Sequence, residues 1–156
     1  LPRARYASDT AQAAFYAQLL PRLRAVPGVA SAALTSSLPL GDNVAYGAYF
    51  VDGRPVPSPQ DAPLADLAHV SDDYFRALAI PMRRGRDFAE TDRFGRGHVA
   101  IVSEALAREQ FRGEDPIGRH VQPWGAEGPK FQIVGVVADV KQHSLADSVR
   151  PALYVP

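Results

Sequence analysis

The chain contains no cysteine, so disulfide bonds and thiolate metal sites are excluded, although the compartment is left open. It has no excess of charge of either sign, because 17 Lys and Arg balance 17 Asp and Glu. A nucleic-acid partner is therefore not expected, since phosphate binding needs a basic surface. A transmembrane helix needs about 20 apolar residues. The longest apolar stretch, near Ile133 to Val137, is far shorter.

Sequence patterns of common catalytic sites are also missing. The histidines do not pair at helical spacing and form no HExxH pattern, so a zinc site has little support. The serines lack the Gly-x-Ser-x-Gly setting of a nucleophile elbow, and Gly95-Arg96-Gly97 lacks the ending of a phosphate loop. We therefore expect no enzyme activity, no catalytic residue and no cofactor. The histidines are His69, His98, His120 and His143.

One acidic cluster leaves an alternative open. Asp87, Glu90 and Asp92 stand at short intervals and could bind a hard cation, which would allow a metal-dependent enzyme. Their spacing does not match an EF-hand loop. We interpret Asp87 as ordering its own turn, with the other two carboxylates in solvent.

The remaining composition is that of a folded domain. The 156 residues are 46% hydrophobic, enough for one core or for two small subdomains that share one. The pattern predicts an amphipathic helix from Ser8 to Val26, with Ser8 or Asp9 as N-cap. Pro21 predicts a kink or an early stop in this helix.

Strands and helices alternate along the rest of the chain. A short helix is expected after a cap at Ser71 or Asp72, and another from its cap Ser103 to Phe111. Together with the Pro-rich loop 54–63, this order predicts an α+β fold with a split βαβ arrangement. Strands are expected over 29–35, 46–51, 64–70, 99–102 and 131–140, and strand-like residues occupy 152–155.

The strand at 46–51 suggests a second reading. Tyr46, Ala48 and Phe50 alternate with Gly47, Tyr49 and Val51, which predicts one core face and one exposed face. The aromatic side chains beside the Pro-rich loop could also form a platform for a small molecule or a peptide. A free-standing sensor domain that binds a small molecule or a peptide is therefore the alternative function.

A set of motifs without reactive groups follows in a fixed order. Each is a strand, a helix start or a turn, which favours a binding or force-transmitting module over an enzyme. The motifs are Val70-Ser71-Asp72-Asp73-Tyr74-Phe75, Gly85-Arg86-Asp87-Phe88, Glu114-Asp115-Pro116-Ile117-Gly118, Val134-Gly135-Val136-Val137-Ala138-Asp139-Val140 and Pro151-Ala152-Leu153-Tyr154-Val155-Pro156.

In this order and spacing the chain resembles the periplasmic core domain of MacB-like permeases of the FtsX type. The similarity is greatest to the long orphan permeases that carry the domain in duplicate, and the opening from Tyr6 to Val29 favours the second copy. The resemblance implies a porter-like split βαβ unit with a smaller inserted mixed subdomain within about 38–130. Residues 1–156 would then be one domain of a longer membrane protein, without the strand that normally precedes it.

The resemblance also implies a function. The domain would face the periplasm at the bacterial inner membrane and would relay the movement of transmembrane helices to substrates or partners. Its own partners would be the transmembrane part of the same permease and a separate cytoplasmic ATPase, while a periplasmic adaptor is left open. The motif residues that we interpret as structural, in turns and close backbone contacts, are Gly85, Arg86, Asp87, Asp115, Pro116, Gly118 and Gly135.

Overall fold

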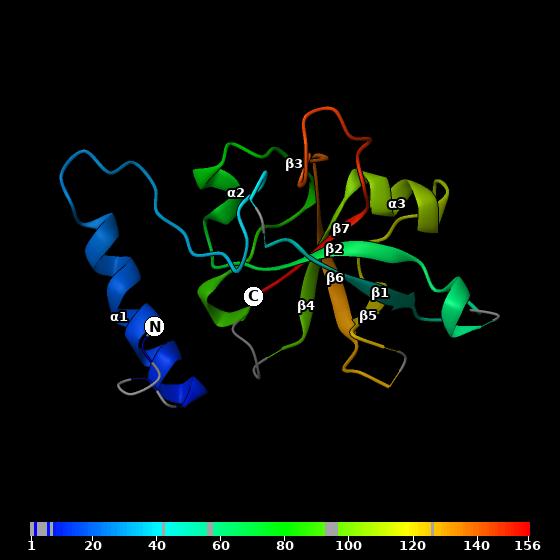
Figure 1. The fold of residues 1–156 in the computed structure, drawn as a ribbon, viewed down its shortest axis with the longest axis horizontal. Coiled ribbons are helices and arrows are strands. Elements are labelled where there is room, and N and C mark those ends of the chain that lie inside the picture. The colour runs from blue at the N-terminus through cyan, green and yellow to red at the C-terminus, as the bar shows by residue number, and fades with distance from the viewer. Residues whose placement is uncertain are drawn as a thin grey trace.

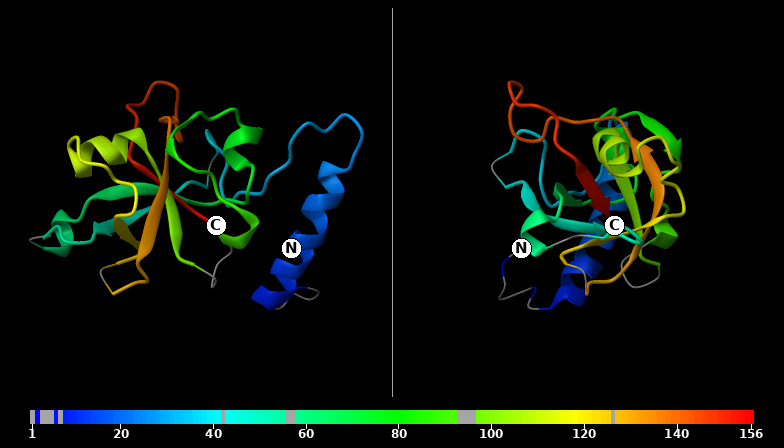
Figure 2. Two further views of the ribbon diagram at one scale, coloured as in Figure 1. Left: turned by 180° about the vertical axis from the view of Figure 1, so that it is seen from behind. Right: turned by 90° about the vertical axis from the view of Figure 1, so that its right-hand side faces the viewer.

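The structure is a computed structural model of the chain, and it describes residues 2, 6, 8–41, 43–55, 58–92, 97–125 and 127–156. It begins with α1 (Asp9–Arg24), which lies beside the rest of the molecule and not on its sheet (Figures 1 and 2). Ser8 is its N-cap and accepts a hydrogen bond from the backbone N–H of Ala11. The helix continues past Pro21 to Arg24, so an early stop is ruled out and a kink stays a prediction.

The side chains of α1 are packed only loosely. Leu20 is buried, but Leu23 in the helix and Val26 just after it are exposed. The helix therefore buries only part of its apolar surface, mainly at Leu20.

The described strands form one seven-stranded sheet in the order β3-β6-β4-β7-β2-β1-β5. The pairs β2–β7 and β4–β6 are parallel, and the other pairs are antiparallel. β5 pairs with β6 as well as β1, so six of the strands close into a ring. The strands are β1 (Ala45–Val51), β2 (Leu64–His69), β3 (Met82–Gly85), β4 (Val99–Ser103), β5 (His120–Pro123), β6 (Phe131–Val137) and β7 (Ala152–Val155).

Short helices cover the sheet. α2 (Tyr74–Ala77) follows β2, and α3 (Glu104–Phe111) joins β4 to β5 (Figure 1). Two 3₁₀ turns, Pro59–Asp61 and Glu90–Asp92, complete the elements. The predicted α+β class is confirmed, and β4-α3-β6 supplies a parallel pair with a helical crossover. All the described strands belong to one sheet, and the division into a porter-like unit and an inserted subdomain stays a prediction.

Each face of the sheet has its own hydrophobic core. One core joins Tyr49 of β1 and Ile133 of β6 to Leu106 and Phe111 of α3. The other joins Tyr154 of β7 to the aromatic rings that follow β2 in the sequence. β1 alternates as predicted, because Tyr49 and Val51 are buried while Tyr46 is exposed. The helix cap at Ser103 is also confirmed, since its Oγ accepts from the N–H of Leu106 at 3.3 Å.

Several local predictions were wrong. Residues 29–35 are not a strand, apart from one bridge between Thr35 and Val70. On either side of this bridge, backbone hydrogen bonds run in one direction only, and side-chain hydroxyls supply the return bonds: Ser71 Oγ accepts from the N–H of Leu34, and Ser36 Oγ accepts from that of His69. Ser71 is therefore not available as a helix cap.

Two other boundaries also differ. The N-cap of α2 is Asp73, in a left-handed conformation with φ of 65° and no hydrogen bond from its side chain, and not Ser71 or Asp72. β6 ends at Val137, three residues before the predicted end, although the N–H of Ala138 still donates to the carbonyl of Pro81. The short strands β3 and β5 were missed.

Candidate functional site

A groove of about 590 Å³ separates α1 from the sheet. The helix contributes Ala13, Tyr16, Ala17 and Leu20 to one wall. The opposite wall is formed by Leu34, Val70, Ser71, Asp72 and Phe88, together with the last residue, Pro156. The lining is mainly apolar, and of the helix residues that line it only Leu20 is buried.

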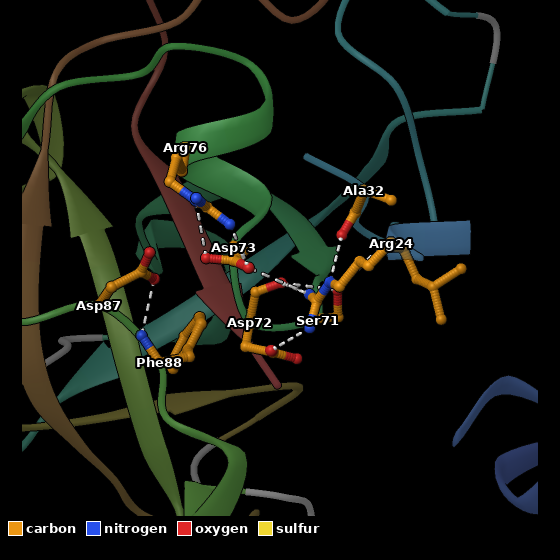
Figure 3. A network of polar contacts seen from close by, with 9 residues as sticks. Arg24, Ala32, Ser71, Asp72, Asp73, Arg76, Asp87 and Phe88 are labelled. Atoms are coloured by element: carbon orange, nitrogen blue, oxygen red, sulfur yellow. Dashed lines mark hydrogen bonds and ion pairs between the residues drawn. The ribbon is translucent and has the colours of Figure 1, made fainter. Parts of the chain in front are cut away.

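Arg24, the last residue of α1, anchors the helix to the body (Figure 3). Its Nη1 donates to Asp72 Oδ2 at 2.8 Å, and its Nη2 donates to the backbone carbonyl of Asp72 at 3.0 Å. The Nε donates at 3.0 Å to the carbonyl of Ala32, in the segment that returns from the helix to the sheet. The Arg24 guanidinium thus binds the body at Asp72 and also the connecting segment at Ala32.

A second guanidinium extends this network. Arg76 of α2 binds Asp73 through two hydrogen bonds of 2.7 and 3.0 Å, and Arg24 lies 3.4 Å from the same carboxylate (Figure 3). The hydrogen bonds to Asp73 raise the pKa of Arg76, so its positive charge is retained. We call Arg24, Asp72, Asp73 and Arg76 the Arg24 network.

Asp87 lies near this network but has a different environment. Its Oδ1 accepts a hydrogen bond of 2.7 Å from the N–H of Phe88. Partial burial raises the pKa of Asp87, and the negative charges of Asp73 and Asp72 raise it further. The expected turn-ordering contact is therefore present, and it lies beside the groove, whose wall includes Phe88.

Three of the sequence motifs meet at β3 and β6. Gly85 pairs with Gly135 across β3 and β6, and the N–H of Arg86 donates to the carbonyl of Val134. A Cβ on Gly85 would lie 2.1 Å from that carbonyl oxygen and 2.9 Å from Ile117. The motif that begins at Gly85 thus contacts the motif of Val134 and Gly135 through the backbone, and the side chain of Ile117 from the third motif lies beside Gly85.

The remaining motif residues lie in turns. Arg86 binds Asp92, with 3.1 Å between Nη2 and Oδ1, and this lowers the pKa of Asp92. Asp115 Oδ1 accepts from the N–H of Ile117 at 3.1 Å, on either side of the buried Pro116. Gly118 adopts a φ of 83° and donates its N–H to Ile133.

The acidic cluster does not converge as a metal site. The carboxylate of Asp92 binds Arg86 and the N–H of Ala89, while Asp87 binds Phe88. Among the residues that the structure describes, no group of three or more His, Asp or Glu side chains could hold a metal ion.

The histidines are spread over the molecule. The ring of His69 stacks on Trp124 with centroids 5.5 Å apart, and His98 contacts Phe131. His143 binds the buried Asp66 at 2.8 Å. The aromatic platform on β1, which the sequence left open as an alternative, is not assembled, because Tyr49 is a core residue and Arg150 lies over the ring of Tyr46.

The Arg24 network could not be found from the sequence. Arg24 is 48 residues from Asp72, and no periodic pattern relates them. The only available signal was a paired Asp72-Asp73 directly before an aromatic helix start.

Comparisons with known proteins support one family. The family model of the MacB-like periplasmic core domain matches residues 3–156. The periplasmic region of MacB from Actinobacillus actinomycetemcomitans matches with a TM-score of 0.60 and 20% identity, over 90% of this chain and 54% of that one. The extracellular domain of the noncanonic ABC-type transporter YknZ from Gram-positive bacteria matches with a TM-score of 0.58 and 19% identity, over 89% of this chain and 60% of that one.

Both identities are low, so these structures support the fold alone, and the chain spans little more than half of each. No curated protein matches the chain. None of the helices in the described ranges combines the length and hydrophobicity that crossing a bilayer requires.

Proposed function

Because the chain belongs to the family of MacB-like periplasmic core domains, we propose that it is the extracytoplasmic domain of an ABC-type permease and that it transmits movement. In this proposal, ATP turnover by a separate cytoplasmic ATPase moves the transmembrane helices of the permease. The domain, on the periplasmic side of the bacterial inner membrane, relays this movement to substrates or partners outside.

The attachment of α1 carries the proposal. Most of the helix is separated from the body by the apolar groove, and Arg24 joins its last turn to Asp72 and to Ala32. Because Arg24 attaches the helix at this end, a force on α1 acts on the residues that bind Arg24. Movement applied to α1 would therefore reach the body through the Arg24 network.

The path into the sheet is short. Asp72 and Asp73 lie between β2 and α2, and Arg76 of α2 binds Asp73. Tyr74 and Phe75 of α2 pack against Tyr154 of β7, which also runs beside β2. A displacement of Arg24 would thus act on the buried aromatic core next to two central strands.

The test is a distance measurement in the reconstituted permease that carries this domain, with its ATPase. This chain has no cysteine, so labelling is specific once any cysteines elsewhere in the permease and in the ATPase are replaced. Spin labels are then placed in a Gln18→Cys, Glu109→Cys double variant, on exposed positions of α1 and α3. We expect the distance between the labels to differ between the nucleotide-free and the ATP-bound states.

Adding Arg24→Ala should reduce or abolish this difference while ATP hydrolysis continues. Adding Arg22→Ala, an exposed arginine of the same helix turn, is the matched control and should preserve it. An identical distance distribution in both nucleotide states would contradict the proposal.

A further inference from the structure

Exposed leucines gather in a second groove, away from α1. This groove, of about 420 Å³, is lined by Leu40, Leu78, Val140 and Leu145 from three separate connecting segments. The exposed fraction is 50% for Leu40, 41% for Leu78 and 72% for Leu145. Leucine side chains brought together from distant segments and left in solvent are typical of a protein interaction surface. We call these four residues and Lys141 the leucine groove.

The walls of the leucine groove are held in place by the fold. The N–H of Leu40 donates to the carbonyl of Gln142 at 2.7 Å, which joins two of the three segments. Gln142 is itself buried and donates to the hydroxyl of Tyr154 at 3.0 Å. The exposure of the leucines is thus not the result of a loop detached from the sheet.

Backbone strain occurs at the same place. Leu40 has a φ of 61° and Ala79 a φ of 53°, in the left-handed region that residues with a Cβ rarely adopt. Ala79 lines the groove next to Leu78. Such conformations persist where the surrounding structure enforces them, and they often mark binding sites.

The charges in the groove indicate the chemistry of a partner. The carboxylate of Asp139 is already engaged by Arg108 at 2.9 Å and by the N–H of Ala105. Lys141 donates to the carbonyl of Leu145, and no carboxylate pairs with it among the described residues. The groove is therefore apolar with one uncompensated positive charge. A second copy of the chain would bring two Lys141 side chains together, which disfavours self-association through this face.

We propose that the leucine groove is the docking surface for an apolar segment of a partner protein that carries a carboxylate. The segment would place its apolar side chains on the leucines and its carboxylate beside Lys141. The proposal deepens the proposed function and rests on it for the compartment in which the partner is met. The loop after β6 contributes Val140 and Leu145 to the leucine groove. In Figure 1 this loop lies at the upper end of the molecule, and the start of α1 lies at the lower end.

The test uses the isolated chain and two synthetic peptides. One peptide is an amphipathic helix with leucines on one face and a single Glu beside them, and its twin has Lys in place of that Glu. We expect the Glu peptide to bind and to shift the backbone amide NMR signals of Leu40, Leu78 and Leu145. The Lys peptide should bind about tenfold more weakly, and Lys141→Glu should reverse this preference.

Leu78→Ala should weaken binding of the Glu peptide about tenfold. Leu64→Ala is the matched control, because Leu64 has a similar exposed fraction of 43% but lies on β2, outside the groove. Equal affinity for both peptides, signal shifts elsewhere on the surface, or no binding would overturn the proposal. Because no membrane or ATPase is present, these results do not depend on whether the domain transmits movement.

Discussion

Gly85 and Gly135 face each other across β3 and β6, and neither position has room for a Cβ. On Gly135 the added carbon would lie 2.5 Å from the carbonyl oxygen of Arg86. The contact is between backbone atoms, so a side-chain rotation cannot relieve it. It fixes the edge strand β3 against β6, and the side chain of Ile117 lies close to Gly85.

Gly135→Ala should therefore be strongly destabilising. We expect the free energy of unfolding to fall by about 3 kcal/mol, because the two strands must separate to admit the methyl group. Urea denaturation followed by circular dichroism measures this. Gly97→Ala is the control, since its Cβ would meet no atom within 4 Å, and it should change stability little. Equal effects of the two substitutions would contradict the close-contact explanation.

Removal of the Arg24 guanidinium should release α1 locally. Arg24→Ala is expected to raise the amide hydrogen exchange of residues 9–24 while the sheet stays protected. The cost in unfolding free energy should be only about 1–2 kcal/mol, because the ion pairs are partly exposed. Arg22→Ala should leave the exchange of α1 unchanged. If both variants exchange alike, Arg24 does not hold the helix.

Ser103 has two structural contacts from one hydroxyl. Its Oγ caps α3 and also accepts a hydrogen bond of 3.0 Å from the N–H of Ala152 in β7. Ser103→Ala would leave buried N–H groups without their partner, so we expect a loss of about 2 kcal/mol. Ser8→Ala removes only the exposed cap of α1 and should cost less than half as much, as thermal unfolding of both variants would measure.

The contributions of Asp92 and Asp87 to the free energy of unfolding should change with pH in opposite directions. The pKa of Asp92 lies below its ordinary value of 3.8 because Arg86 binds the charged form. Its stabilising contribution is complete above the unfolded-state pKa and is lost as the pH falls through the lower folded-state pKa. Asp92→Asn should therefore lower the unfolding free energy at about pH 7 by about 2 kcal/mol, and by less in acid.

Asp87 has a raised pKa, chiefly because burial disfavours its charge. Its protonated form favours folding at low pH, and this contribution is lost as the pH rises through the folded-state pKa. Asp87→Asn, which keeps an oxygen for the N–H of Phe88, should therefore be neutral or stabilising at about pH 7. Urea denaturation of both variants at neutral and acidic pH tests the contrast. A loss of stability with Asp87→Asn would show that the charge itself is needed.

The sequence predicted the elements that have a strong local signal. β1 and β4 and the caps at Ser8 and Ser103 were found from alternation or from capping chemistry. β3 was missed because Arg83 and Arg84 give it no apolar alternation, and β5 is too short to show a period. Residues 29–35 read as a strand, but side-chain hydroxyls satisfy part of their backbone, which propensity cannot reveal.

Less of the candidate site than of the secondary structure could be predicted from the sequence. The glycine and turn residues were identified as structural from their type, although their contact with one another depends on β3. The Arg24 network and the leucine groove join segments far apart in the chain, and only the fold brings them together. Single-sequence patterns report local periodicity and therefore carry no information on such pairs.

The closure of the sheet has a consequence for the protein at high concentration. β5 pairs with β1 on one side and with β6 on the other, so among the described strands β3 alone has a single neighbouring strand. That strand is four residues long and carries two exposed charged side chains, Arg83 and Arg84, which make it a poor template for pairing with another strand. The domain is thus protected against intermolecular strand addition, the route by which open sheets form aggregates.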